Sequence, residues 1–155
     1  MMTFKYASSQ LSESDLDEVE CRFGFRFPPD FRRLYLQSNG GRPDRDRFVD
    51  ANGSCIVDAF LPIKYARPPL NLFEKSIEWL KLDQRLVPDH LVQFAVDPFG
   101  NLFCFSTKAD EFGAIYWFRT ERNRARHAEF LSPSLDDFLG RLKAKDEDSR
   151  GDGMP

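Results

Sequence analysis

Apolar side chains recur at helical spacing over residues 11–24, where Leu16, Val19 and Phe23 share one face. Ser12 stands where a side-chain oxygen caps the first turn of a helix. A glycine closes the segment, and glycine readily adopts the left-handed conformation that ends helices. This pattern predicts a helix with one buried face and one densely acidic face.

A second helix is predicted over residues 28–41. Pro28 and Pro29 suit a first helical turn, because the backbone angle of proline is already helical. Phe31 and Tyr35 then share a face. The Asn-Gly-Gly sequence at the end stops the helix, since glycine adopts backbone angles closed to most residues. The two helices are expected to pack as an antiparallel or angled pair.

The spacing of apolar residues changes in the middle of the chain. Residues 48–50 and 54–62 are rich in β-branched and aromatic side chains, and the Ala-Asn-Gly between them predicts a hairpin turn. A third helix is predicted over residues 72–80, with Asn71 as its cap. The side chains expected to face inward are those of Leu72, Phe73, Ile77 and either Leu80 or Trp79.

The following segment predicts a second hairpin. Residues 91–96 and 101–106 are predicted strands, and they flank an Asp-Pro-Phe-Gly turn at 97–100. In such a turn the aspartate bonds the backbone beyond it, proline fixes its own φ and glycine takes positive φ. A further strand is predicted over residues 113–119 and a last helix over residues 134–142.

These elements fit one domain over residues 1–142. A chain of 155 residues is long enough to bury about 70% of the surface that it exposes when unfolded. Sixteen phenylalanines, four tyrosines and two tryptophans favour sheet surfaces packed under helices. Helices and strands in mixed order predict an α+β fold. Residues 143–155 are polar and charged, and we expect them to form a disordered tail.

The balance of charge narrows the classes of partner. Acidic and basic residues number 25 and 22, are interspersed, and leave a net charge of -3. No basic stripe is present of the kind that binds nucleic acid, so no direct nucleic-acid partner is expected. Neither a leader sequence nor an apolar run long enough to cross a bilayer is found, which predicts a cytoplasmic protein without a membrane partner.

The residue types that most often carry chemistry are few. Cys21, Cys55 and Cys104 are widely separated in apolar surroundings, which predicts buried reduced thiols rather than disulfides or a metal site. His90 and His127 are the only histidines, and they offer no catalytic or metal-binding spacing. We therefore predict no catalytic residues, no metal and no cofactor. An enzyme based on carboxylates brought together by the fold remains an alternative.

The order of motifs resembles the SUKH superfamily, which includes the fungal cell-wall-synthesis regulator and many bacterial immunity proteins. The resemblance covers roughly residues 10 to 142 and implies an α+β fold with a twisted, mainly antiparallel sheet flanked by helices. It also implies function by protein binding. The motifs that carry it are an acidic helix ending in Phe23-Gly24, then Phe27-Pro28-Pro29-Asp30-Phe31, Ser38-Asn39-Gly40-Gly41, Leu86-Val87-Pro88, Phe94-Ala95 and Asp97-Pro98-Phe99-Gly100-Asn101.

The resemblance suggests two kinds of partner. Bacterial relatives neutralise polymorphic toxins, often nucleases, by forming a complex with them, whereas fungal relatives act as regulatory scaffolds. The short chain looks more like the bacterial type. The leading hypothesis is therefore an immunity protein that binds a cognate toxin, and the alternative is a regulatory or scaffolding module for an endogenous partner.

Acidic residues form the candidate partner-binding site. A carboxylate cluster steers a basic partner towards it, and nuclease toxins often present basic surfaces to their substrate. The competing interpretation is a solvated helix face without a binding role. The candidate residues are Asp15, Asp17 and Glu18 of the first helix and Asp44 and Asp46 of the following charged loop.

Two further sets of residues have a structural explanation beside a functional one. Asp97, Gly100 and Asn101 resemble a ligand site, but turn formation already accounts for their chemistry. Aromatic residues near predicted loops are candidate interface anchors, and core packing explains them equally well. These aromatic residues are Phe48, Tyr65, Phe99 and Phe112.

Overall fold

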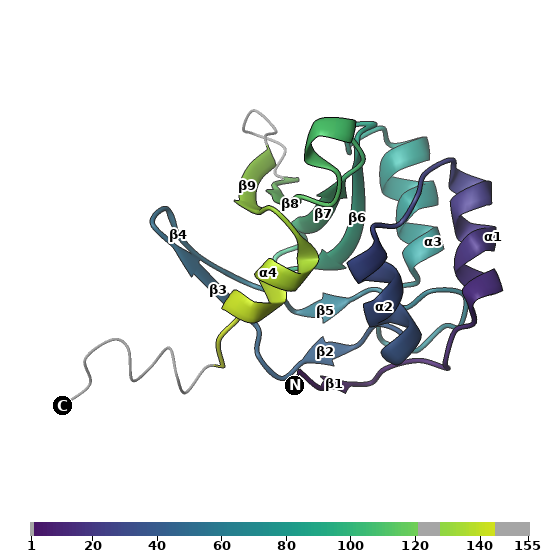
Figure 1. Ribbon diagram of the computed structural model, residues 1–155, viewed down its shortest axis with the longest axis horizontal. Coiled ribbons are helices and arrows are strands. Elements are labelled where there is room, and N and C mark those ends of the chain that lie inside the picture. The colour runs from purple at the N-terminus through teal and green to yellow at the C-terminus, as the bar shows by residue number, and fades with distance from the viewer. Residues whose placement is uncertain (1, 121–127, 145–155) are drawn as a thin grey trace.

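A five-stranded antiparallel sheet forms the centre of the protein in the computed structural model, which describes residues 2–120 and 128–144 (Figure 1). The spatial order β5-β6-β7-β8-β9 follows the order of the chain, and each neighbouring pair is antiparallel. The α+β class and the mainly antiparallel sheet are thus confirmed. The strands are β5 (Ala59–Phe60), β6 (Leu91–Val96), β7 (Leu102–Ser106), β8 (Ile115–Phe118) and β9 (Ala128–Ser132).

Helices flank this sheet. The third predicted helix begins with a short α-helical turn and continues directly as a π-helix to Asp83, three residues beyond the predicted end. Its first turn has no side-chain cap, so the expected role of Asn71 is wrong. The helical elements are α1 (Glu13–Phe23), α2 (Pro29–Gln37), α3 (Phe73–Ser76), the π-helix η1 (Ile77–Asp83), the 3-10 turn η2 (Ala109–Glu111) and α4 (Leu135–Arg141).

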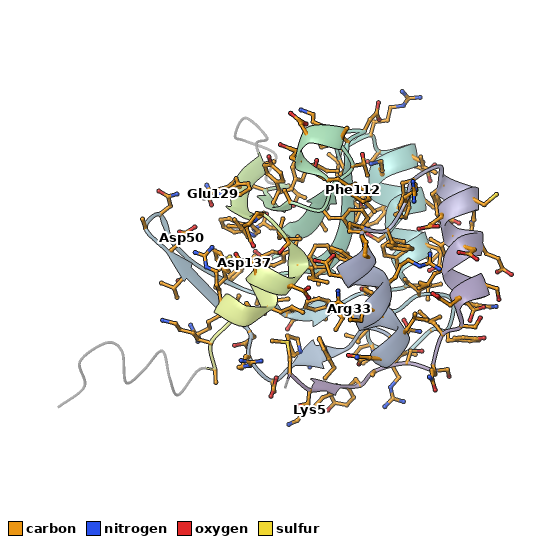
Figure 2. All side chains as sticks on the ribbon, in the orientation of Figure 1. Lys5, Arg33, Asp50, Phe112, Glu129 and Asp137 are labelled. Carbon is orange, nitrogen blue, oxygen red and sulfur yellow. The ribbon has the colours of Figure 1, made fainter. Side chains whose placement is uncertain are left out.

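Both faces of the central strands are covered. Phe103 and Phe105 of β7 point into the larger apolar cluster, which also contains Phe31 of α2 and Phe138 of α4. Leu102 alternates with them and belongs to a smaller cluster, against which the partly buried Leu80 of η1 packs. Figure 2 shows how closely side chains fill the space around the sheet. Because both faces are buried, β6 and β7 lack alternation of polar and apolar residues.

Two short two-stranded sheets lie outside the central one. The predicted strand over residues 54–62 divides at 57–58, so that its first part pairs in a hairpin and its second part joins the central sheet. The hairpin projects from the body at the left of Figure 1. The outlying strands are β1 (Phe4–Lys5), β2 (Arg42–Pro43), β3 (Arg47–Asp50) and β4 (Gly53–Ile56).

Three further features differ from the sequence-based expectations. Cys21 is exposed, because it lies off the apolar face of α1, whereas Cys55 and Cys104 are buried and all three are free. Strands β1, β2 and β9 were not predicted. Lys143, placed in the expected tail, pairs with Arg47 through two backbone hydrogen bonds of 2.8 and 3.0 Å. The rest of that tail, residues 145–155, lies outside the described residues.

Candidate functional site

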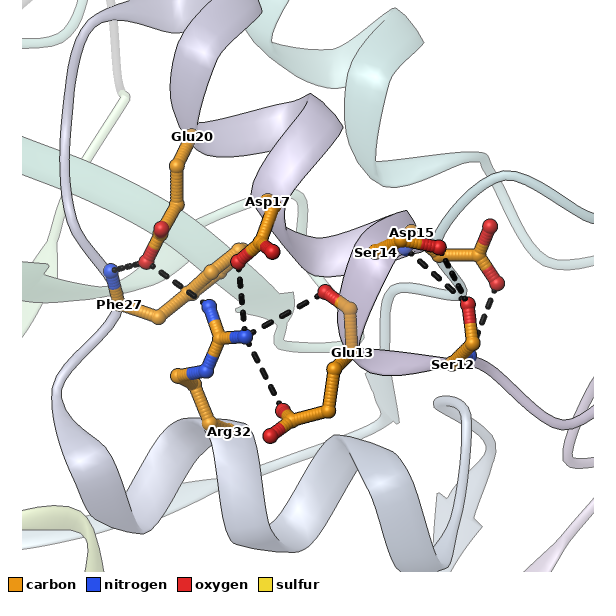
Figure 3. Close-up of polar contacts among 8 residues, drawn as sticks. All are labelled: Ser12, Glu13, Ser14, Asp15, Asp17, Glu20, Phe27 and Arg32. Carbon is orange, nitrogen blue, oxygen red and sulfur yellow. Dashed lines mark hydrogen bonds and ion pairs between the residues drawn. The ribbon is translucent and has the colours of Figure 1, made fainter.

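The first turn of α1 shows the capping that its sequence predicts. The Ser12 hydroxyl accepts a hydrogen bond from the backbone N–H of Asp15 at 3.2 Å, and the Asp15 carboxylate accepts one from the Ser12 N–H at 2.9 Å (Figure 3). This reciprocal pair satisfies donors that every helix start leaves free. The Asp15 side chain is only 9% exposed, so this candidate binding residue makes its contacts inside the protein and not with a partner.

Arg32 of α2 contacts three carboxylates of α1 (Figure 3). Its guanidinium donates to Glu13 and Asp17 at 3.0 Å each and lies 3.2 Å from a Glu20 oxygen. That Glu20 oxygen also accepts a hydrogen bond from the backbone of Phe27, at 2.7 Å, where the chain turns from α1 towards α2. The acidic face of α1 therefore helps to hold the two helices together.

Lys64 approaches the same helix from another side. Its ammonium lies 2.6 Å from Asp15 and 4.0 Å from Glu18. The hydrogen bond from Lys64, supported by the Ser12 backbone, holds the pKa of the Asp15 carboxyl below its usual range. The same bond raises the pKa of Lys64. Both groups remain charged near neutral pH.

The outer carboxylates remain open to solvent despite these pairings. The exposed fractions of the Glu13, Asp17 and Glu18 side chains are 68%, 66% and 70%. We call these three residues the acidic surface. The five carboxylates of α1 share two basic partners, Arg32 and Lys64, in the contacts described above. The surface therefore keeps an excess of negative charge.

Asp44 and Asp46 lie elsewhere. The segment between β2 and β3 lies well apart from α1 in Figure 1, so the structure does not join these two aspartates to the acidic surface. Asp44 is exposed and accepts a hydrogen bond from the backbone of Thr3 at 3.1 Å. Asp46 is half-buried, and its backbone donates to Lys143 at 3.1 Å.

The Asp97 turn has the structural role expected of it. One Asp97 oxygen accepts from the backbone N–H groups of Phe99 and Asn101 at 2.8 Å each. The other oxygen lies within hydrogen-bonding distance of the Asn101 amide and the Trp117 indole, at 3.0 and 3.3 Å. Both carboxylate oxygens are thus occupied by the turn and by β8.

The candidate aromatic anchors separate into two groups. Phe48 is buried and stacks on Phe138, with ring centroids 5.2 Å apart, so it belongs to the core. The side chains of Tyr65, Phe99 and Phe112 are exposed. Core packing therefore explains Phe48 alone among the four.

The described titratable groups include no arrangement suited to metal binding. Within residues 2–120 and 128–144, no three His, Cys, Asp or Glu side chains are grouped to hold an ion. Burial raises the pKa of the Cys55 and Cys104 thiols to about 12, so both are neutral and poorly nucleophilic at physiological pH. Burial also lowers the pKa of His90. His127 lies outside the described residues.

Sequence reasoning identified the carboxylates of α1 but missed their partners. Asp15 and Lys64 are 49 positions apart, and no local pattern connects them. Arg32 is 15 positions from Asp17, on a different helix. Only the capping sequence indicated that the Asp15 carboxylate bonds to the start of its own helix.

Comparison with known proteins decides the family. A model of the SMI1 / KNR4 family (SUKH-1) matches residues 10–141, which span the chain from just before α1 to the end of α4. The chain belongs to the SMI1 / KNR4 family. This membership confirms the SUKH resemblance and its fold. SMI1 / KNR4 proteins are generally non-catalytic immunity or regulatory proteins, so membership supports a protein-binding role.

A search of curated proteins finds no match to the chain. Of the helices that the structure describes, none has the length and apolar character needed to span a membrane.

Proposed function

We propose that the protein is an immunity protein that binds a cognate toxin domain in the cytoplasm and blocks it in a stoichiometric complex. Membership of the SMI1 / KNR4 family is the observation that carries this proposal. The excess of carboxylates on α1 supports it, because a basic toxin surface of the kind found on nucleases is drawn to such a cluster.

The partner-binding residues proposed on α1 are Asp17 and Glu18. Both carboxylates are mostly exposed, so a basic side chain of a partner reaches them without unfolding the helix. Asp44 and Asp46 are proposed as a second, separate acidic contact. Asp15 is left out of the contact surface, since its carboxylate is nearly buried and already holds Ser12 and Lys64.

Co-expression tests the proposal. The protein is produced with the C-terminal domain of a large secreted protein encoded beside its gene, and growth and co-purification are measured. We expect the domain alone to arrest growth, and the protein to restore growth and to purify with it. Toxicity without rescue, or the absence of any adjacent toxin, would favour the regulatory-scaffold alternative, in which deletion causes a phenotype without a toxin.

Charge reversal tests the proposed contact surface. The variant Asp17→Lys/Glu18→Lys is expected to weaken the complex, and Asp44→Lys/Asp46→Lys tests the second contact in the same way. The control is Asp89→Lys/Asp110→Lys, which changes two exposed carboxylates outside α1 and gives the same net charge. Equal affinity of the α1 variant and the control would remove α1 from the interface.

A further inference from the structure

A groove of about 450 Å³ lies between the helix formed by α3 and η1 and the turn that joins β6 to β7. Its walls are apolar where the helix meets the sheet, and charged side chains stand at its rim. Its lining includes Trp79 and Leu80 of η1, Leu102 of β7, and the charged residues Lys75, Glu78 and Asp83.

Trp79 stands out among the side chains of this helix. It is 61% exposed, whereas Phe73 and Ile77 are buried in the core. Its neighbour Leu80 is half-buried and packs against the smaller apolar cluster. Tryptophan is among the residue types that contribute most binding energy at protein interfaces. An exposed tryptophan on the wall of an apolar groove is therefore a candidate binding residue.

Trp79 lies in the π-helical part of this helix. The Trp79 carbonyl accepts a hydrogen bond of 2.9 Å from the N–H of Gln84, five residues on. This wider turn is rare in proteins and is found frequently at functional sites. Within this segment Trp79 lies on the outer surface, whereas Ile77 and Leu80 face the sheet.

The groove is continuous with α1. Glu78 at the rim is bound by Arg22, and Arg22 lies four residues after Glu18 on the same helix face. A path therefore runs along the surface from Glu18 through Arg22 and Glu78 to Trp79. Lys75 also pairs with Glu78, at 3.4 Å.

We infer that this groove holds a large apolar side chain of the same toxin domain that α1 attracts. This inference rests on the proposed function. The occupant is an apolar residue with a neighbouring Lys or Arg, because the exposed Asp83 carboxylate stands at the groove, whereas the other carboxylate there, Glu78, is paired with Arg22 and Lys75. Asp83 and the acidic surface orient a basic partner, and the tryptophan supplies the buried contact.

Truncation of Trp79 tests the inference. Trp79→Ala is expected to weaken binding of the neutralised toxin domain by about tenfold or more, as loss of a central aromatic anchor does. Phe130→Ala is the matched control, because Phe130 is 52% exposed but lies on β9, away from α3 in Figure 1. It should change the dissociation constant by less than about threefold.

A second variant at the same position tests whether the effect of Trp79→Ala reflects only the loss of side-chain bulk. Trp79→Arg keeps a long side chain but places a positive charge against the basic flank, so it should weaken binding more than Trp79→Ala. Circular dichroism and thermal unfolding of each free variant confirm that it is folded.

The outcomes separate the two proposals. If the wild-type protein binds the toxin domain and both Trp79 variants bind it equally well, the groove is not the docking site and the proposed function stands. If the wild-type protein neither binds nor neutralises the domain, the proposed function fails and this inference fails with it.

Discussion

Gly40 and Gly41 let the chain after α2 lie close to two other backbone segments. A Cβ atom on Gly40 would lie 2.7 Å from the Pro62 backbone nitrogen, and one on Gly41 would lie 2.6 Å from the Lys5 carbonyl oxygen. The adjacent Asn39 amide binds the same region, since it donates to Ile63 and accepts from it at 2.8 Å each. These three residues thus fix the course of the chain beyond the helix end.

A comparison of two glycines tests this close approach. Gly24 and Gly40 have nearly equal φ values, 73° and 74°, but a Cβ on Gly24 meets no atom within 4 Å. Gly24→Ala is expected to cost about 1 kcal/mol, from backbone strain alone. Gly40→Ala should cost about 3 kcal/mol or more, because backbone atoms must also move apart. Urea unfolding measures both, and equal losses would contradict a close backbone approach at Gly40.

At the residue scale, local patterns were informative and distant partners were not. The Ser12 cap and the Asp97 turn were predicted because each uses residues at most four positions apart. The sequence predicted a helix end at Asn39 but not its bonds to Ile63, 24 positions away. Contacts of that kind depend on the folded chain.

Helices α1 and α2 are joined by charge as well as by apolar contact. Arg32 contacts three carboxylates of α1 with its side chain 23% exposed, whereas the next residue, Arg33, pairs only with Asp136 of α4 in the described contacts. The Arg33 and Asp136 side chains are both more than half exposed. We therefore expect the two adjacent arginines to contribute different amounts to the stability of the fold.

This pair of arginines provides a test of the helix contact. Arg32→Met is expected to lower the free energy of unfolding by about 1–2 kcal/mol, because three carboxylates lose a shared donor. Arg33→Met should change it by at most about 0.5–1 kcal/mol, as exposed ion pairs contribute little. Chemical denaturation at low salt measures both values. A loss for Arg33→Met as large as for Arg32→Met would contradict the proposed role of Arg32.

At the element scale, the predicted helices and strands are present, whereas strands β1, β2 and β9 were missed. Strand β9 is five residues long and half-exposed, and it becomes recognisable through its pairing with β8. The π-helix also escaped prediction, since apolar spacing over seven residues does not separate it from an α-helix.

At the scale of the whole molecule, the acidic surface and the groove form one extended side of the protein. The sequence predicted a single domain and an acidic helix, but it did not show which carboxylates are occupied. It left Trp79 and Leu80 as alternatives for the buried position, and the structure assigns the inward position to Leu80. Exposed charges are screened by salt, so association through this side should slow as ionic strength rises.

According to the proposed function, the protein acts by binding a toxin and not by catalysis. The most direct test is a titration of the activity of the purified adjacent toxin domain against the purified protein. We expect activity to fall in proportion to the protein added and to vanish near equimolar amounts, with both chains recovered intact from the complex. Inactivation by a small fraction of an equivalent would indicate turnover and contradict this account, as would full toxin activity in the presence of excess protein.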